Sequence, residues 1–272
     1  MFWQGRNPAA TVYESIGRDF FLALAPGWLN LGLWEGSGTE EEAPVAVRRL
    51  VETLAGDLPT GGVVLDVGSG LGVQDAVIAE VARPRHLIAL NITESQLREG
   101  RGALSDAGAS PVAGDAMRIP LTDNSVDGVI SVEAAFHFRS RQRFFAEAGR
   151  VLRPGGILTM SDVPIRRLPG GPIELFAGLI QLRAWGLRSI AAATPEQIAA
   201  AAESEGFQDV HLELCGDRVI DPALAVIGRR LETTSDVPAS MRLAAQLMLA
   251  QMRFLRRRGV IDYLLLRATA PG

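Results

Sequence analysis

The sequence has one cysteine, three histidines and no long apolar run, and each shortage excludes a class of protein. A single cysteine, Cys215, excludes an internal disulfide and a cysteine-rich metal site. No stretch approaches the roughly eighteen consecutive apolar residues of a membrane span. The first residues, MFWQGRN, lack the basic start and apolar run of a signal peptide. We therefore expect a cytoplasmic protein.

The charge balance is slightly acidic. The 31 acidic side chains outnumber the 27 basic ones, which are all arginine, so the net charge is −4. The chain thus lacks the excess of basic side chains that binds a nucleic-acid backbone or an anionic membrane, and we expect neither as a partner. Hydrophobic residues make up 47% and charged residues 21%, which is typical of a globular chain.

Short apolar segments alternate with helical ones in the middle of the chain. Strands are predicted at 63–67, 86–91, 110–114, 126–132 and 156–162. Helices are predicted from the glycine loop to 82, at 93–107 with Thr93 as N-cap, and at 140–152, which a loop at 153–156 ends. This alternation indicates βαβ units, so we predict an α/β fold with a doubly wound, mostly parallel sheet. Segments 206–215 and 260–268 are predicted to add two strands.

The flanking regions are predicted to be helical. Residues 1–58 form an N-terminal cap segment with helices at 9–24 and 40–56, and residues 59–272 form the main domain. Lid insertions are predicted at about 165–188 and 218–258. Both are rich in Leu, Ile and Met, with Phe176 and Trp185, and both follow strands, so they can cover the carboxyl edge of the sheet and bind an apolar ligand. The alternatives are core packing or the interface of a homo-oligomer.

A glycine loop, LDVGSGLG, follows the first strand at 65–72. Gly68 and Gly70 permit positive φ and leave room for a ligand beside the backbone. The N–H groups of the next helix face the same space. A dinucleotide fingerprint would require glycine where Val73 stands, and Asp66 suits an amino-bearing cation better than a pyrophosphate. An NAD(P)-dependent oxidoreductase remains the rival prediction.

Four blocks in this order resemble the class I S-adenosylmethionine-dependent methyltransferases: LDVGSGLG, LNITESQ (90–96), GDAMRIPLTDNSVDGVISVEAAFHF (114–138) and RVLRPGG (150–156). The resemblance runs from about residue 60 to 163. It is nearest to small-molecule methyltransferases of natural-product and lipid pathways, including sugar and macrolide O-methyltransferases. Tyr13 and NLGLW (30–34) also resemble that group, in which an N-terminal helix and loop close over the cofactor. The resemblance implies a Rossmann-like fold and S-adenosylmethionine as cofactor.

The resemblance also assigns cofactor contacts. It implies that Gly68 and Gly70 approach the methionine part and that Asp115 bonds the adenine amino group, although Asp115 could instead be a turn residue. The other implied cofactor residues are Tyr13, Asp66, Asn91 with Ile92 and Gln96 near the ribose, Ala116 beside the adenine, and Val132 with Glu133 at the sulfonium. Asn91 replaces the acidic residue usual in the class, yet an amide can still donate and accept hydrogen bonds.

Methyl transfer from a sulfonium requires in-line placement of the nucleophile and no metal. An alcohol must also lose its proton, which suggests a general base. We predict His137 as this base, because it follows the fourth strand at the edge where doubly wound folds bind ligands. Asp162 ends the fifth strand at the same edge and is predicted to orient the imidazole and raise its pKa. His86 and His211 are predicted to lie away from the site.

Two other interpretations of these residues stay open. His137 could be a pocket wall packed between Phe136 and Phe138. Glu133 could stabilise a cation, which would indicate carbon methylation of a prenyl-type alkene. A cyclase, or a protein that only binds S-adenosylmethionine, is possible on the same scaffold. Our prediction is methyl transfer to a hydroxyl of a bulky apolar small molecule in natural-product biosynthesis.

Overall fold

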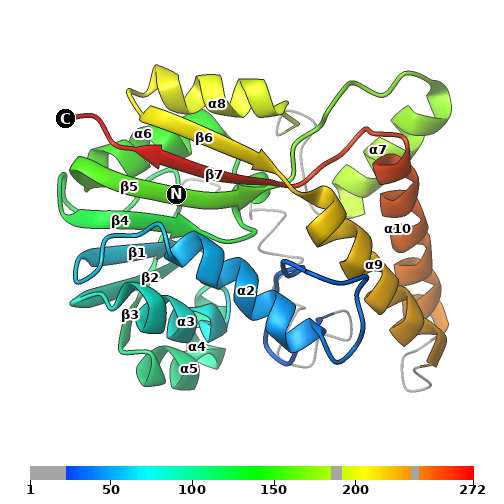
Figure 1. The fold of residues 1–272 in the computed structure, drawn as a ribbon, viewed down its shortest axis with the longest axis horizontal. Coiled ribbons are helices and arrows are strands. Elements are labelled where there is room, and N and C mark those ends of the chain that lie inside the picture. Colours follow the sequence, from blue (N-terminus) through cyan, green and yellow to red (C-terminus); the bar gives the residue numbers. More distant parts are fainter. Residues whose placement is uncertain (1–22, 185–191, 234–238) are drawn as a thin grey trace, which may run out of the picture.

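The computed structural model describes residues 23–184, 192–233 and 239–272, and these form a central sheet flanked by helices (Figure 1). The strand order is β3-β2-β1-β4-β5-β7-β6. The strands are β1 (Val63–Val67), β2 (His86–Asn91), β3 (Ala109–Ala113), β4 (Val126–Ser131), β5 (Leu152–Asp162), β6 (Gln208–Leu214) and β7 (Leu264–Thr269). The first five are parallel, and β7 runs antiparallel to both of its neighbours. The predicted doubly wound, mostly parallel sheet is confirmed.

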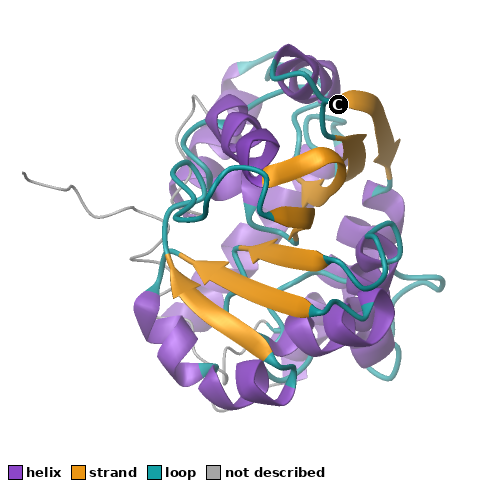
Figure 2. Cartoon of the chain, turned by 90° about the vertical axis from the view of Figure 1, so that its left-hand side faces the viewer, coloured by secondary structure: helices purple, strands orange, loops and turns teal. Residues whose placement is uncertain are grey.

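Helices cover both faces of this sheet (Figure 2). One face packs against α2 (Ala43–Ala55), α3 (Val73–Ala82), α4 (Glu94–Glu99) and α5 (Arg101–Asp106), and the other against α6 (Arg141–Val151) and α8 (Pro195–Ser204). Consecutive residues of β1 show the division, since Val64 belongs to the first apolar cluster and Leu65 to the second. Because strand side chains alternate between faces, a strand that is buried on both sides has a continuous apolar run in its sequence.

Three further helices lie beyond the carboxyl ends of the parallel strands: α7 (Pro172–Ala184), α9 (Gly216–Thr233) and α10 (Ala239–Arg257) (Figure 1). Helix α10 packs against both α7 and α9. Helix α9 is joined to the N-terminal segment, because the Trp34 N–H donates to the Arg218 carbonyl at 2.8 Å and Arg230 forms an ion pair with Glu40. No described helix combines the length and the apolar character that crossing a membrane requires.

Two predicted boundaries are wrong. The helix at 93–107 is interrupted at Gly100, where a Cβ would lie 2.2 Å from the Leu71 carbonyl oxygen, so the chain breaks the helix where it approaches the glycine loop. Thr93 occupies the N-cap position but makes no side-chain capping bond. The loop predicted at 153–156 is instead the irregular start of β5, whose pairing with β4 shifts register there. Most of the helix predicted at 9–24, including Tyr13, lies outside the described residues, as does Trp185 of the predicted lid.

Candidate active site

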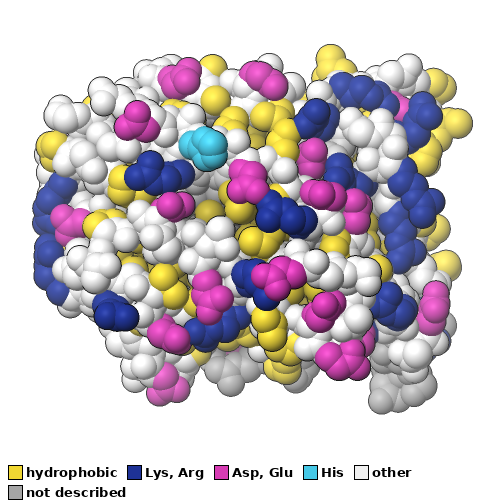
Figure 3. All heavy atoms as spheres, in the orientation of Figure 1, with side chains coloured by type: hydrophobic (Ala, Val, Ile, Leu, Met, Phe, Trp, Pro, Cys, Tyr) yellow, Lys and Arg dark blue, Asp and Glu magenta, His cyan; other side chains and the backbone are white. Residues whose placement is uncertain are grey.

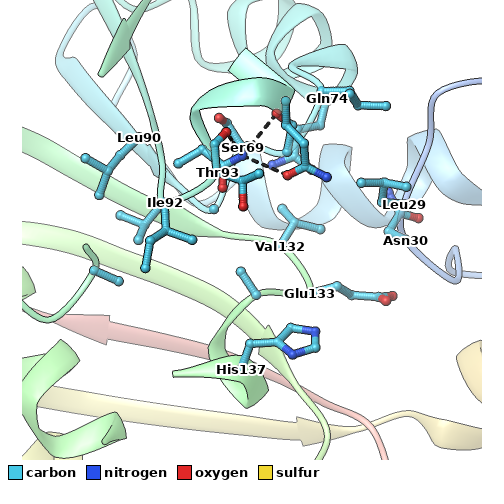
Figure 4. Close-up of a pocket in the computed structure, with 18 of the residues that line it drawn as sticks. Leu29, Asn30, Ser69, Gln74, Leu90, Ile92, Thr93, Val132, Glu133 and His137 are labelled. Atoms are coloured by element: carbon cyan, nitrogen blue, oxygen red, sulfur yellow. Dashed lines mark hydrogen bonds between the residues drawn. The ribbon is translucent and has the colours of Figure 1, made fainter. Parts of the chain in front are cut away.

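A cavity opens at the carboxyl edge of the sheet (Figure 4). Its walls are the turn after β1, the ends of β2 and β4, the turn after β3, the short helix η1 (Ala135–His137) and the N-terminal loop at 27–30. The empty space, its opening included, is about 960 Å³. Segments that lie far apart in the sequence therefore line one shared space.

The glycine loop leaves its side of the cavity free of side chains. Gly68 and Gly70 have φ values of +90° and +58°, a region that favours glycine. A Cβ on Gly68 would lie 2.3 Å from the Ala134 Cβ, and one on Gly70 would lie 3.3 Å from Leu29 Cδ1. Between them, the buried hydroxyl of Ser69 has no hydrogen-bond partner in the described structure. The loop therefore offers space and an unsatisfied polar group to a ligand.

The end of β2 contributes a polar pair. The Asn91 amide donates to Gln96 Oε1 at 2.9 Å and to the Gly70 carbonyl at 3.3 Å. Both side chains are buried and line the cavity, with Ile92 beside them. The structure thus brings together the three residues that the sequence assigns to the ribose region.

The turn after β3 brings Asp115 and Ala116 to the cavity wall. The Asp115 carboxylate accepts a hydrogen bond from the Met117 N–H at 3.0 Å. Asp115 therefore does what a turn residue does and also faces the cavity, so the two readings of this residue are compatible.

Asp66 differs from its predicted placement. It is fully buried behind the glycine loop, and its carboxylate accepts a 2.6 Å hydrogen bond from Gln74, which does line the cavity. Burial raises the pKa of Asp66 to about 7. Asp75 is also fully buried, both of its carboxyl oxygens lack a hydrogen-bond partner among the described residues, and burial together with Asp66 raises its pKa. Asp66 thus acts on the cavity through Gln74.

Glu133 lies at the junction of four segments. It follows β4 in a left-handed conformation, with φ +50°, and its N–H donates to Ser161 Oγ at 2.8 Å. Its Oε1 accepts from the Leu31 N–H at 2.7 Å and from the Tyr263 hydroxyl at 2.9 Å. Burial raises the pKa of Glu133 to about 7, against the lowering effect of those two donors. The backbone N–H is therefore committed to Ser161, while the side chain reaches the cavity.

His137 lines the cavity on η1, close to Glu133 (Figure 4). Its ring centroid lies 4.2 Å from that of Phe136. Burial, and then the positive charge of Arg141, lowers the pKa of His137 to about 3. The imidazole is therefore neutral across the physiological pH range.

The predicted pairing of Asp162 with this ring is wrong. Asp162 is fully buried and accepts from Arg141 Nε at 2.5 Å and Nη2 at 2.8 Å, as well as from the Val163 N–H. Arg141, the first residue of α6, takes the carboxylate because a bidentate guanidinium can satisfy both of its oxygens. The effect on His137 therefore has the opposite sign, since the charge that shifts its pKa is the Arg141 cation, which lowers it.

Several cavity residues were not predicted: Trp28, Leu29, Asn30, Ser69, Gln74, Thr93, Met117 and Phe138. Asn30 stands in the NLGLW segment, whose resemblance indicated a closing loop, so that signal was present. Tyr263 has no motif around it, and only the fold brings it to Glu133. His86 and His211 are exposed and are absent from the cavity wall, as predicted. The described residues contain no cluster of three His, Cys, Asp or Glu side chains that could hold a metal ion.

Comparison with known proteins agrees with this geometry. Residues 65–160 match the family described as "Methyltransferase domain". The chain is 30% identical over 252 residues to the erythromycin 3''-O-methyltransferase of Saccharopolyspora erythraea, covering 86% of this chain and 79% of that one. It is 29% identical to the 27-O-demethylrifamycin SV methyltransferase of Amycolatopsis mediterranei, covering 89% and 90%.

Solved structures show the same fold. Geranyl diphosphate C-methyltransferase from Streptomyces coelicolor, solved with S-adenosylhomocysteine, has a TM-score of 0.75 at 14% identity and covers 96% of each chain. The residues of the cavity fit such a cofactor: two left-handed glycines give it room, and the orphaned Ser69 hydroxyl gives it a partner. The chain belongs to the class I S-adenosylmethionine-dependent methyltransferases that act on small molecules.

Proposed function

We propose that this enzyme methylates a hydroxyl group of a bulky, apolar small molecule in natural-product biosynthesis. The proposal is supported by the erythromycin 3''-O-methyltransferase and the 27-O-demethylrifamycin SV methyltransferase, which align with most of the chain. The observation that carries the proposal is the neutral imidazole of His137 in the cavity wall, beside the position where the methyl donor is expected.

The cofactor supplies an electrophilic methyl group when bound. Gly68 and Gly70 are proposed to hold its methionine part, and Val132 with Glu133 to face the sulfur. The remaining proposed contacts are Asn91, Ile92 and Gln96 at the ribose and Asp115 and Ala116 at the adenine. All of these residues line one cavity, so a single extended ligand can reach them together.

A low pKa does not disqualify His137 as the base. The hydroxyl oxygen attacks the methyl carbon with one of its lone pairs, and the resulting protonated ether is a far stronger acid than an imidazolium with a pKa of about 3. His137 can therefore accept the proton as, or after, the C–O bond forms. The nearby Arg141 charge keeps the ring ready to accept, because it disfavours protonation beforehand.

The acceptor is proposed to be apolar because of the outer helices. Helices α7 and α10 leave large apolar side chains exposed at the carboxyl side of the sheet: Ile173, Leu175, Phe176, Leu179, Met241, Leu243 and Leu247. In Figure 3, apolar side chains and arginines alternate along the right-hand edge, where α10 lies in Figure 1. Exposed apolar surface of this kind favours a ligand or a second chain. The described lining of the cavity contains no α7 or α10 residue, so the two helices would act at its mouth.

Carbon methylation is the second candidate, and one observation favours it. The Glu133 carboxyl reaches the same cavity, where a carboxylate could stabilise a carbocation formed on an alkene. A structurally similar protein is a C-methyltransferase, and this likeness shows the fold alone. Membership in the methyltransferase family displaces the oxidoreductase alternative.

The two candidates separate in one experiment. The protein is incubated with methyl-labelled S-adenosylmethionine and two panels of acceptors, apolar polyketide or sugar alcohols and prenyl alkenes without a hydroxyl. Carbon-13 NMR of the product then distinguishes a methyl on oxygen from one on carbon. O-methylation whose kcat at saturating cofactor falls about 10²- to 10⁴-fold in His137→Ala but much less in Glu133→Gln supports the proposal. Methylation of the alkene panel alone, lost in Glu133→Gln, would overturn it.

A further inference from the structure

Glu133 has an unusual backbone conformation just after β4. The residue adopts a left-handed conformation although it is not glycine, with φ +50°. Strain of this kind persists where surrounding contacts hold it, and it is concentrated at functional sites. Here the contacts come from three other segments: Leu31 of the N-terminal loop, Ser161 of β5 and Tyr263 before β7.

The Tyr263 hydroxyl holds the Glu133 carboxyl in place. The Tyr263 side chain is fully buried, and its hydroxyl donates to Glu133 Oε1 at 2.9 Å and also hydrogen-bonds Ser161. Ser161 accepts from the Glu133 N–H at the same time. The three residues therefore form a closed ring of hydrogen bonds that sets both the backbone and the side chain of Glu133. Glu133 lines the cavity, and in Figure 4 its side chain extends from the wall near Val132 and His137 toward the side where Leu29 and Asn30 lie.

We propose that the Glu133 carboxylate interacts with the positive charge on the cofactor sulfur. The site then binds the sulfonium S-adenosylmethionine more tightly than the neutral thioether S-adenosylhomocysteine. Tyr263 is the residue that positions the Glu133 carboxyl. The inference rests on the proposed function, because it takes the sulfur to lie beside Val132 and Glu133. It adds a role in discriminating substrate from product, which methyl transfer itself does not require.

The physical basis is the change of charge during the reaction. When the methyl group passes to the acceptor oxygen, the electron pair of the broken S–C bond stays on sulfur, which becomes neutral. An ionised carboxyl at this position has a counter-charge before transfer and none after it. In a site of low dielectric constant this loss is costly, so the carboxyl takes up a proton or the product leaves.

The other charged groups near Glu133 do not provide a negative charge next to the sulfur. The charged or titratable side chains on the elements packed around Glu133 are Glu35, Asp66, His137, Arg141, Asp162, Asp262 and Tyr263. His137 stays neutral because its pKa is lowered to about 3, and Tyr263 stays neutral because burial raises its pKa. Arg141 and Asp162 neutralise each other.

Glu35 is exposed and pairs with Arg49, which leaves two carboxyls to compare with Glu133. Asp66 is the buried carboxyl whose pKa also lies at about 7, and it sits behind the glycine loop. Asp262 is bound by backbone N–H groups of Gly216 and Tyr263 and by Arg256. Because Asp66 contacts the cavity wall through Gln74, the carboxyl-to-amide control is instead Glu147→Gln, at a partly buried carboxyl of α6 outside the cavity lining.

The test is calorimetric and needs no turnover. The affinities of the full chain for S-adenosylmethionine and S-adenosylhomocysteine are measured between about pH 6 and about pH 8. Since both ligands carry the same amino and carboxylate groups, the ratio of their dissociation constants isolates the sulfur. An opposite charge in contact lowers a carboxyl pKa by about 1–3 units, so the ratio should rise in favour of the sulfonium by about five- to tenfold over this range.

The variants assign the effect. Glu133→Gln should give a small ratio that does not change with pH. Tyr263→Phe should give an intermediate ratio, and Glu147→Gln the wild-type pH dependence. Sinefungin, whose amine carries a positive charge in place of the sulfonium, should follow S-adenosylmethionine. A pH-independent ratio in the wild type, or a wild-type ratio in Glu133→Gln with its fold confirmed by thermal melting, would overturn the inference alone. If neither cofactor bound, the proposed function would fall as well.

Discussion

The two halves of the cavity are built in different ways. The cofactor half consists of the loop after β1 and the ends of β2 and β3, and each contributes a short continuous stretch of sequence. The half around the proposed methyl group depends on contacts between distant segments, since Glu133 is held by the Leu31 N–H and by the Tyr263 hydroxyl. The first half works through backbone geometry, and the second through side chains that meet only in the folded chain. A site of the first kind leaves a local sequence pattern, whereas a site of the second kind does not.

The sharpest test of the cofactor half is Gly68→Ala. A Cβ there would lie 2.3 Å from the Ala134 Cβ, in a backbone with φ +90°. We expect loss of measurable S-adenosylmethionine binding in calorimetry. Gly61→Ala is the matched control, because Gly61 is also left-handed, with φ +75°, and has no atom within 4 Å of its Cβ position. It should cost only the about 1–2 kcal/mol of a strained left-handed residue. Equal effects of the two substitutions would mean that strain, not space, governs the loop.

On the acceptor half, His137→Ala should lower kcat by about 10²- to 10⁴-fold, as expected for loss of a general base. Cofactor affinity should change little. Because the pKa of His137 is lowered to about 3, the unprotonated base is present throughout the neutral range. The kcat of the wild type at saturating cofactor should therefore be flat from about pH 5 upward. An acidic limb near the ordinary histidine pKa of about 6.5 would contradict this placement of the ring.

Asp162→Asn distinguishes a structural carboxylate from a catalytic one. The substitution leaves the buried Arg141 charge without its partner, which typically costs about 3–5 kcal/mol of unfolding free energy. Urea denaturation measures this loss. The control is Asp123→Asn, because Asp123 pairs with Arg150 at the surface, where such pairs contribute about 0–1 kcal/mol. A variant of wild-type stability with a slow turnover would return Asp162 to the predicted role beside the imidazole.

Asp75 gives the cofactor half a predicted pH dependence. Its pKa in the folded chain is raised, so the folded state keeps a proton that the unfolded state releases near about pH 4. The contribution of Asp75 to stability should therefore be highest at low pH and fall as the pH rises through its folded-state pKa. Asp75→Asn removes this loss, and its advantage over the wild type should grow from pH 5 to pH 8 to about 1–3 kcal/mol. Asp106→Asn, at an exposed position on α5, should show no such trend in thermal melts.

The smallest effect is expected on the outer helices. Phe176 on α7 is 66% exposed. If it contacts an apolar acceptor, Phe176→Ser should raise the KM for that acceptor about tenfold, near the lower end of the about 1.5–3 kcal/mol for burying such a side chain. The KM for the cofactor should stay constant. Val45→Ser, on the exposed side of α2, is the control. A change in sedimentation with no change in KM would make α7 an interface between copies.

These differences explain how far the sequence could lead. The buried strands and the glycine loop have local signatures, so β1, Gly68 and the Asn91–Gln96 pair could be predicted. The partner of Asp162 could not, because adjacency of β4 and β5 places the start of α6 and the end of η1 at the same edge, and only the geometry shows that Arg141 reaches the carboxylate. The break at Gly100 depends on the approach of Leu71, a contact between residues far apart in the chain.

A crystal structure of the protein with S-adenosylhomocysteine tests the central claim most directly, because it shows whether the two halves serve one reaction. We expect the adenine beside Asp115 and Ala116, the ribose at Asn91, and the sulfur next to Glu133, with the side of the sulfur from which the methyl leaves facing His137. A sulfur atom directed away from His137, or a nucleotide bound outside this cavity, would contradict the account.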